Sequence, residues 1–308
     1  MAPVSGQRLP AAVLCALLAS CGQRPTSPGV TLAGGDGGGL PRSEPQSEQM
    51  DAKALQSAAA VAAQAGAQAF LVARHGHLLV EHYGSGSGAT DLFDGGAMAQ
   101  TLAAVTAGAA VAEGKLTPDT ARFDPVALSA AISAATGSSY VDYASQRVWQ
   151  PLNANTARFT SDAAGAMRAD CCLAARAGDW QRLGILLLQT GNFEGSTIVP
   201  AEWVARMRRP LTDDATRGFG VWLPVNGRDP AVVGGEAFAV RDVYFLCGAE
   251  GTRLWLAPSL QLAVLFIAAP NAPAADHTGL FNQVIRAVQD RPQESRDQSL
   301  LQQLVPGH

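Results

Sequence analysis

Residues 252–268, TRLWLAPSLQLAVLFIA, carry the strongest indication of fold in this sequence. Two apolar segments, RLWLA (253–257) and LQLAVLFIA (260–268), flank the turn-forming pair Pro258 and Ser259. Apolar and aromatic runs of this kind on either side of a turn predict a β-hairpin. Because the second run is far shorter than the roughly 18 residues of a membrane-spanning helix, we expect a buried strand there.

A second hairpin is predicted nearer the start of the chain, where AFLVAR (69–74) and HLLVEHY (77–83) surround His75 and Gly76. Apolar spacing predicts helices and further strands in the rest of the chain. The helices are expected at 51–68, 97–114, 125–135, 139–149, 179–190, 200–208 and 276–290, and the strands at 220–223 and 243–247. Strands from both ends of the chain with helices between them predict an α/β (α+β) fold, an antiparallel sheet flanked by helices.

The composition is that of a globular protein. The chain has 308 residues and a formal charge of −4, with 47% hydrophobic and 16% charged residues, which argues against a disordered chain. No basic block is present, so a nucleic-acid partner is not expected. Lys53 and Lys115 are the only lysines among 22 basic residues. Chemistry that needs a lysine therefore has two candidates.

The first 21 residues resemble a bacterial lipoprotein signal. A polar segment with one charge, Arg8, precedes the apolar run AAVLCALLAS (11–20) and then Cys21. LASC (18–21) looks like a lipobox, in which the cysteine thiol is lipidated after residues 1–20 are removed. The alternatives are a plain signal peptide with a chance cysteine, or a buried apolar helix. A lipid on Cys21 would make a membrane the partner of this protein.

The expected organisation after the signal is a linker at 21–50, a folded domain at 51–290 and a polar tail at 291–308. Residues 22–50 hold seven Gly, four Pro and three Ser, a composition that cannot bury enough apolar surface to order itself. Gly22 follows the lipobox cysteine. An Asp at that place favours inner-membrane retention in lipoproteins, so its absence favours the periplasmic side of the outer membrane over the inner membrane.

Three cysteines remain in the expected mature chain, namely Cys171, Cys172 and Cys247. In an oxidising compartment Cys247 could form a disulfide with Cys171 or Cys172, and three buried thiols are the alternative. No Cys/His spacing predicts zinc, and no metal or other cofactor is expected. Gly76 also separates the histidines of the first hairpin, and no carboxylates complete a ligand set with them (His75, His77 and His82).

The run AARAGDWQRLGILLLQTGNFEGSTIVPAEWVARMRRP (174–210) resembles the serine β-lactamase and penicillin-binding-protein superfamily. The similarity is to the class C-like branch with esterases and 6-aminohexanoate-dimer hydrolase, in which an Arg/Asp helix precedes a Gly–aromatic–x–Gly turn and Ile-Val-Pro-x-x-Trp-Val. Segments 109–119, 138–152 and 252–266 are also similar, so the resemblance spans roughly residues 65–290. It implies a β-lactamase-like fold. The helical region is expected to be reduced, because only 20 residues (116–135) separate Lys115 from Thr136.

The first catalytic motif of this family, Ser-x-x-Lys, falls at Ala97-Met98-Ala99-Gln100. In the family the serine oxygen attacks a carbonyl, and the lysine on the same helix face helps to deprotonate it. Alanine has no nucleophile, and a glutamine amide is not a base. Met50 and Ala112 stand three residues before the two lysines, so the motif occurs nowhere else. Ala97 and Gln100 are therefore expected to be vestigial motif positions rather than catalytic residues.

The resemblance implies two further motifs. None of the four tyrosines begins a Tyr-x-Asn motif, whose tyrosine relays protons, and the near match Tyr143-Ala144-Ser145 lies in the following helix. The turn that should carry Lys/His-Thr/Ser-Gly reads Cys247-Gly248-Ala249-Glu250-Gly251, where Glu250 would repel a substrate carboxylate. His277-Thr278-Gly279 fits that pattern but starts the final helix, so we interpret it as a chance match.

These replacements predict a lipid-anchored, β-lactamase-related pseudoenzyme of the cell envelope with a binding or scaffolding role. The backbone N–H of Ala97, at a helix N-terminus, could still meet an anion or a carbonyl oxygen. The alternative is an active serine hydrolase (an esterase, amidase or β-lactamase-like enzyme) with a displaced nucleophile, for which the candidates are Thr101, Ser85, Ser87 and Ser161. A decayed gene product without a selected function is a third interpretation.

Overall fold

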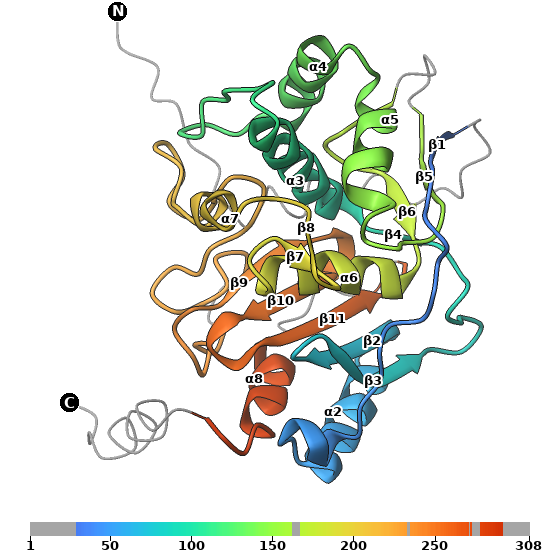
Figure 1. Ribbon diagram of the computed structural model, residues 1–308. Coiled ribbons are helices and arrows are strands. Elements are labelled where there is room, and N and C mark those ends of the chain that lie inside the picture. The colour runs from blue at the N-terminus through green and yellow to red at the C-terminus, as the bar shows by residue number, and fades with distance from the viewer. Residues whose placement is uncertain (1–28, 162–166, 233–234, 271, 273–277, 292–308) are drawn as a thin grey trace, which may run out of the picture.

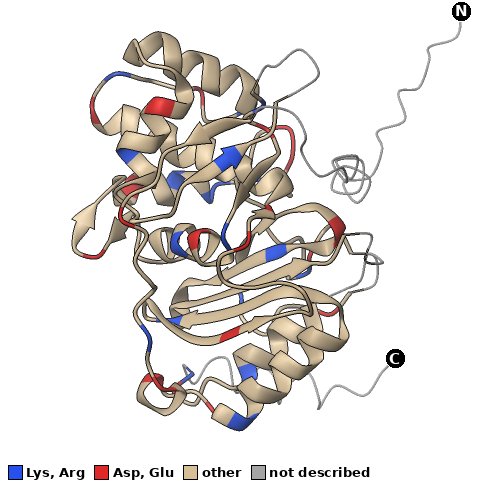
Figure 2. Ribbon diagram, turned by 90° about the vertical axis from the view of Figure 1, so that its right-hand side faces the viewer, with Lys and Arg blue, Asp and Glu red and all other residues tan. Residues whose placement is uncertain are grey.

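The computed structural model describes residues 29–161, 167–232, 235–270, 272 and 278–291. The expected signal, Cys21 and almost all of the expected tail lie outside the described residues. Among the helices of the described part, none is long and apolar enough to cross a membrane. Acidic and basic residues are interspersed along the ribbon (Figure 2).

A five-stranded antiparallel sheet forms the centre of the fold, in the order β3-β2-β11-β10-β9 (Figure 1). Its strands are β2 (Ala67–Arg74), β3 (His77–Tyr83), β9 (Tyr244–Cys247), β10 (Arg253–Ala257) and β11 (Leu262–Ala268). The pairing of β10 with β11, with Trp255 opposite Val264, confirms the predicted hairpin. The pairing of β2 with β11, with Leu71 opposite Leu265, confirms that both ends of the chain build one sheet.

Both faces of this sheet are covered by helices, which explains why its strands read as continuous apolar runs. Alternate residues face opposite sides of a strand. On one side Leu71, Leu254 and Leu265 pack in the same cluster as α3 (Ala99–Ala112) and α6 (Ala177–Leu188). On the other side Phe70, Trp255 and Phe266 pack with α2 (Ala52–Gln64) and α8 (Thr278–Arg286), as Figure 1 shows.

A helical region lies beyond α6, built on α3 and completed by α4 (Pro125–Thr136), α5 (Tyr140–Ala144), a helical turn at Ser145–Trp149 and α7 (Ala201–Met207). A small sheet in the order β1-β5-β6-β4 borders it. Its strands are β1 (Val30–Leu32), β4 (Phe93–Asp94), β5 (Ala157–Phe159) and β6 (Leu173–Ala175), while β7 (Asn192–Phe193) and β8 (Ser196–Thr197) form a separate hairpin. Short 3-10 turns stand at Pro45–Glu48, Gly96–Met98, Ala249–Gly251 and Pro258–Leu260.

The strand expected at 220–223 does not form. Trp222 makes only isolated bridges, to Arg217 and Phe245. Gly220 has a positive φ of +80°, which turns the chain out of the extended conformation just before Trp222. The segment therefore crosses the edge of the central sheet as a loop.

Residues 29–50, which we call the strap, do not form the free linker that their composition predicts. They run from the helical region along the edge of the central sheet to α2 (Figure 1). At the upper end β1 pairs with β5, and the buried Arg182 donates hydrogen bonds to the carbonyls of Gly38 and Leu152. Further along, the Leu78 N–H of edge strand β3 donates to the Pro41 carbonyl over 2.7 Å. The strap thus covers an otherwise open sheet edge.

The lower end of the strap is held by charged groups at the β2–β3 turn. The buried Arg74 donates to the Glu48 carbonyl over 2.6 Å and pairs with Asp290 over 2.7 Å. His75 Nδ1 and His77 Nδ1 lie 2.7 and 2.9 Å from the two oxygens of Glu48. Burial alone would raise the pKa of Glu48, but the His75 hydrogen bond and the nearby histidine charges hold it below its usual value. Two of the histidines considered for a metal therefore face one carboxylate.

Helix α3 is buried on nearly all sides, so its small residues determine how closely its neighbours pack. Trp203 of α7 lies against it and donates its indole N–H to the Ala104 carbonyl over 3.0 Å. A Cβ on Gly108 would overlap the Trp203 ring. Gly108 is therefore required by this contact and not by backbone conformation.

We expect Gly108→Ala to lower the free energy of unfolding. Alanine gains about 1 kcal/mol of helix propensity, but overpacking against Trp203 costs about 1–3 kcal/mol, so a net loss of about 1 kcal/mol follows. Gly178→Ala in α6 is the matched control, because nothing lies within 4 Å of its Cβ position. Denaturant unfolding of the three proteins measures the difference, and a Gly108→Ala protein as stable as Gly178→Ala would contradict this packing.

Candidate functional site

The vestigial motif positions lie where the chain leaves β4 and enters α3. Gly95 donates its N–H to the Leu173 carbonyl over 2.9 Å, and Gly96 donates to Asp94 Oδ1 over 2.8 Å. Gly96 has a φ of +53°, and a Cβ there would lie 2.9 Å from the Ala249 nitrogen. The fold therefore brings Ala97 beside the 247–251 turn. The resemblance assigned these two segments to one site. We call Ala97, Gln100 and this turn the vestigial site.

Gln100 has a hydrogen-bond partner on each side of its amide. Its Nε2 donates to the Asp170 carbonyl over 3.1 Å, and its Oε1 accepts from Arg217 Nη2 over 2.7 Å. Gln100 and Ala97 are both buried and lie one helical turn apart, on the same face. The alanine supplies only a methyl group, and the glutamine links a loop on one side to a guanidinium on the other.

Arg217 is the residue at this site that the sequence did not reveal. Its guanidinium lies 4.9 Å from the Trp222 ring centre and 5.8 Å from that of Phe123. Its Nε is buried and has no hydrogen-bond partner in the described part of the protein. Burial lowers the pKa of Arg217, and the charges of Asp214 and Asp213 oppose that shift. An arginine remains charged in spite of such a shift, so a fixed positive charge stands beside Gln100.

Phe123 is one of the aromatic residues that the structure places near Arg217, together with Trp222. Its ring packs edge-on against Phe219, with ring centres 4.8 Å apart. It also lies 3.4 Å from the Cβ position of Gly220, which in turn is 3.2 Å from the Gln100 carbonyl oxygen. A phenylalanine has no hydroxyl and cannot relay a proton. Only the tertiary structure identifies it, because its sequence context, Arg122-Phe123-Asp124-Pro125, indicates no more than a helix start.

Tyr143, the near match to Tyr-x-Asn, lies at the opposite end of α3. Its ring centre is 5.6 Å from Lys115 Nζ, which pairs with Glu113 over 2.6 Å just after the helix ends. Burial raises the pKa of Tyr143 to about 12. The 14 residues of α3 span about 21 Å at 1.5 Å per residue. Neither Tyr143 nor Lys115 can therefore act at Ala97.

The remaining lysine and the second pattern match also lie elsewhere. Lys53 is in the first turn of α2, on the face of the sheet that α8 also covers. Thr278 begins α8 on that same side, while His277 lies outside the described residues. The lysines of the described chain therefore supply no base to the vestigial site.

The candidate displaced nucleophiles lie in three different surroundings. Thr101 is buried, and its Oγ1 donates to the Gly220 carbonyl over 2.6 Å. Ser85 and Ser87 belong to the turn after β3, where the Ser87 N–H donates to the Gly84 carbonyl. Ser161 is buried and bridges to Met167.

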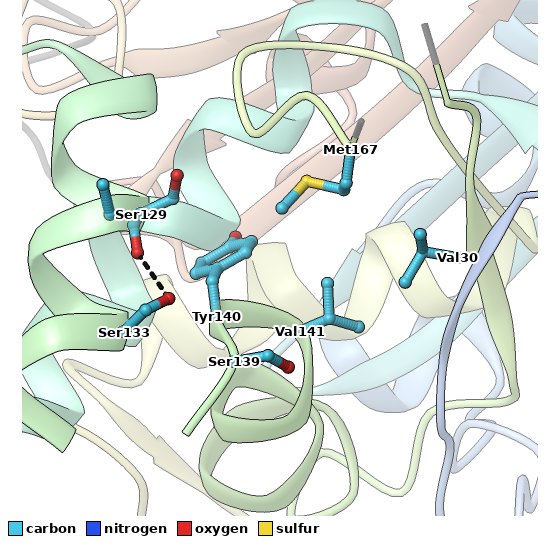
Figure 3. A pocket seen from close by; sticks show the side chains of 8 residues that line it. Val30, Ser129, Ser133, Ser139, Tyr140, Val141 and Met167 are labelled. Carbon is cyan, nitrogen blue, oxygen red and sulfur yellow. Dashed lines mark hydrogen bonds between the residues drawn. The ribbon is translucent and has the colours of Figure 1, made fainter. Parts of the chain in front are cut away.

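A pocket of about 350 Å³ is separate from the vestigial site (Figure 3). It lies between α4, α5 and the start of the strap, and it is lined by Val30, Ser129, Ala130, Ser133, Ser139, Tyr140, Val141 and Met167. Its serine hydroxyls are used locally, since Ser133 donates to the Ser129 carbonyl and Ser139 donates to Asp142 over 2.6 Å. No lysine, histidine or arginine lines it, so this pocket offers a serine no base.

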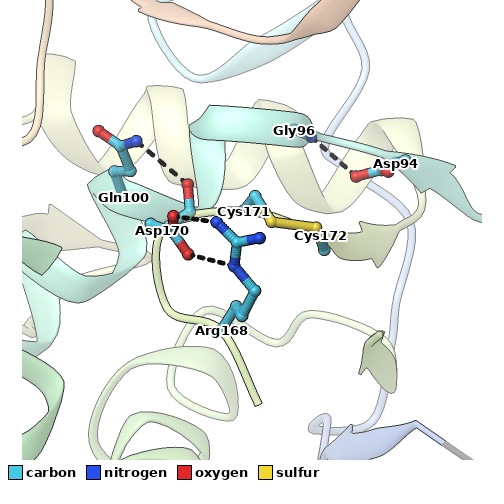
Figure 4. The surroundings of a disulfide bond; sticks show 7 residues. All are labelled: Asp94, Gly96, Gln100, Arg168, Asp170, Cys171 and Cys172. Atoms are coloured by element: carbon cyan, nitrogen blue, oxygen red, sulfur yellow. Dashed lines mark hydrogen bonds and ion pairs between the residues drawn. A yellow bond between two sulfur atoms is a disulfide. The ribbon is translucent and has the colours of Figure 1, made fainter. Parts of the chain in front are cut away.

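A disulfide joins Cys171 to Cys172 (Figure 4), and the pairing of Cys247 with Cys171 or Cys172 stays a prediction. The two residues are adjacent in sequence, and Cys172 has a φ of +70°. This left-handed turn brings the neighbouring side chains together. The turn adjoins the vestigial site, because Asp170 accepts the Gln100 hydrogen bond through its carbonyl and binds Arg168 through both carboxylate oxygens, over 3.1 and 2.7 Å.

No family model and no curated protein matches this sequence. Solved structures with the same fold were found. A protein from Bacillus anthracis described as a 6-aminohexanoate-dimer hydrolase has a TM-score of 0.64 at 12% identity, over 89% of this chain and 92% of that chain. A family VIII carboxylesterase has a TM-score of 0.59 at 11% identity, over 78% and 97%. A β-lactamase from Mycobacterium bovis has a TM-score of 0.54 at 18% identity, over 73% and 93%.

These likenesses establish the fold. The chain has the fold of the serine β-lactamases and penicillin-binding proteins, as its resemblance at 174–210 implied. At such low identity they carry no statement about activity. The function must be argued from the residues of this chain.

The Cys171–Cys172 disulfide can be checked by mass. Trypsin should release residues 169–176, ADCCLAAR, as one unlinked peptide. Without reduction we expect it two hydrogen masses light and unreactive toward iodoacetamide, and with reduction we expect it to take up two alkyl groups. Recovery of this peptide crosslinked to residues 242–253, which contain Cys247, would restore the pairing first predicted.

Proposed function

We propose that this chain is a lipid-anchored protein of the cell envelope that keeps a serine hydrolase fold without its covalent chemistry and acts by binding or scaffolding. One observation carries this proposal. The Gln100 amide is hydrogen-bonded between the Asp170 carbonyl and Arg217, and Ala97 precedes it by one turn. The place of a nucleophile and its base is thus taken by groups that can do neither task.

Covalent chemistry at this site would depend on the movement of one proton, that of the nucleophile's hydroxyl. Acyl transfer to a serine needs a base close enough to take the hydroxyl proton. At the position of the family lysine stands Gln100, which is neutral, and its partner Arg217 cannot be deprotonated in a protein. Phe123 has no hydroxyl to complete a relay. A nucleophile restored at Ala97 alone would therefore have no lysine to take its proton.

A hydrolase with a displaced nucleophile is the less favoured function. Thr101 is the nearest candidate in sequence, and its hydroxyl already donates to the Gly220 carbonyl from a buried position. To attack a carbonyl it would have to give up that hydrogen bond and find a base. In the described part of the chain, the partner of this hydroxyl is a carbonyl oxygen and not a base.

The inactive site can be tested by covalent labelling. We expect purified wild-type protein to take up neither a fluorophosphonate probe nor a fluorescent penicillin above the level of a heat-denatured sample. Ala97→Ser/Gln100→Lys provides a nucleophile and a base on one helix face, and labelling of this variant would show that the probes reach the site. Labelling of the wild type that disappears on changing a single Ser or Thr, with Thr101→Val as the first variant, would refute the proposal.

The anchor and location are the second part of the proposal, and LASC (18–21) supports them. Residues 22–28 would join the lipidated Cys21 to the strap, whose contacts start at β1. The envelope location follows from the export signal, and Gly22 after the cysteine favours the outer membrane.

The lipid can be followed with labelled palmitate in a bacterial host. We expect the label to enter the wild-type protein and to be absent from Cys21→Ala, with Cys15→Ala as the matched control that keeps the label. Sucrose-gradient separation of the membranes should place the wild type with the outer membrane. Equal labelling of wild type and Cys21→Ala would exclude lipidation at this residue.

A further inference from the structure

We propose that the Cys171–Cys172 disulfide is a redox switch, whose oxidised form holds Gln100 in place and whose reduced form releases it. The inference goes beyond the proposed function, because it concerns what positions Gln100 and not whether the site reacts. The bond adjoins Asp170, whose carbonyl accepts the Gln100 hydrogen bond over 3.1 Å (Figure 4). A redox change in this turn therefore acts on a residue of the vestigial site.

The turn has a backbone conformation that a cysteine disfavours and that the disulfide holds. The φ of Cys172 is +70°, in the left-handed region, which costs energy for a residue with a Cβ. While the sulfur atoms of two neighbouring residues are bonded, the turn between them cannot open. Once the bond is reduced, no covalent link opposes rotation about the N–Cα bond of Cys172 toward the extended region that such residues prefer.

The small sheet determines which side of Cys172 moves. The Cys172 carbonyl accepts from the Thr160 N–H over 2.9 Å, and the next carbonyl, that of Leu173, accepts from the Gly95 N–H over 2.9 Å. Leu173 also begins β6, which lies between β5 and β4 in this sheet. Because the chain after Cys172 is held in this way, the residues before it take up the rotation, and Asp170 is one of them.

Gln100 transmits the change to the rest of the vestigial site. The Asp170 carbonyl holds its Nε2, and its Oε1 accepts from Arg217 Nη2 over 2.7 Å. When the carbonyl turns away, Nε2 loses this partner, the amide rotates more freely, and its hold on the guanidinium weakens. The two conformations of the turn thus correspond to two arrangements of Gln100 and Arg217, and the redox state selects between them.

The chemical step is thiol–disulfide exchange with a dithiol. One thiolate of the dithiol attacks one cysteine Sγ and expels the other cysteine as a thiolate. The second thiol then attacks the sulfur of its own mixed disulfide and frees the remaining cysteine. The dithiol ends as a disulfide, and its two protons pass to the two cysteine thiolates.

The position of the bond suits such a reaction. Cys171 and Cys172 keep 4% and 5% of their surface accessible, and Arg168 of the same turn is exposed, so the bond lies just below the surface. The cell envelope that we propose for this chain is an oxidising compartment. The disulfide is therefore the expected resting form, and a dithiol reductant is the signal that changes it.

The test follows the Gln100 side-chain amide by proton–nitrogen NMR of the full chain, with and without dithiothreitol. Its signal is identified by its absence from Gln100→Glu. In the oxidised protein we expect this signal to lie apart from those of solvent-exposed glutamines, and on reduction we expect it to shift to their position. The Thr160 and Gly95 backbone amides should keep their slow hydrogen exchange, because the small sheet stays intact.

Two variants assign the response to this disulfide. Cys171→Ser/Cys172→Ser cannot form it, so we expect its Gln100 signal to match that of the reduced wild type and to ignore dithiothreitol. Cys247→Ser removes a different cysteine and keeps this disulfide, so its Gln100 signal should shift on reduction as in the wild type. Thermal unfolding confirms that each variant is folded, and the reduced wild type remains informative if the double variant does not fold.

Three results would overturn the proposal: a Gln100 signal that does not shift on reduction, a shift that is lost in Cys247→Ser, or a peptide 169–176 that stays unreactive toward iodoacetamide when the folded protein is treated with dithiothreitol. Fast exchange at Thr160 and Gly95 on reduction would also overturn it, because the whole sheet would then have opened. Covalent labelling of the wild type by a fluorophosphonate would refute the proposed function but leave this result standing.

Discussion

The antiparallel pairing of β2 with β11 is the contact on which the rest of the domain depends. It joins strands from opposite ends of the chain, from Arg74 opposite Leu262 to Ala67 opposite Ala268. Closing so long a loop costs chain entropy, and burial of both sheet faces offsets it. The chain between β3 and β9 must leave the sheet and return to it. The vestigial site lies where these paths meet, with the start of α3 against the turn after β9.

This arrangement explains how the site can keep its shape without the residues of the Ser-x-x-Lys motif. The walls are set by main-chain contacts, such as Gly95 with Leu173 and Gly96 with Asp94. None of these contacts needs a serine or a lysine. Arg217 places a cation beside the former motif, but a guanidinium does not accept protons as a lysine amine can. The lysine of the family motif is thus replaced by a neutral amide with a fixed charge beside it.

The strap shows where reasoning from composition fails. Residues 29–50 are rich in Gly, Pro and Ser and carry little apolar surface, yet Leu32, Leu40 and Met50 are buried at intervals along them. Other contacts are backbone hydrogen bonds to distant residues, such as Leu78 to Pro41 and Gln289 to Gln49. Composition reports what a segment can bury by itself. It does not report the donors and acceptors that the rest of the fold offers to it.

The sequence by itself determined the elements and the loss of the motif. Apolar runs around a turn are local signals, so the β10–β11 hairpin, the mixed fold and the absence of a Ser-x-x-Lys pair follow from residue order alone. Only the tertiary structure decided what replaced the motif. Arg217 and Phe123 are far from Gln100 along the chain, and the Cys171–Cys172 pairing depends on a left-handed turn at Cys172. These features arise from side chains that meet across the fold, and such meetings leave no periodic pattern in a single sequence.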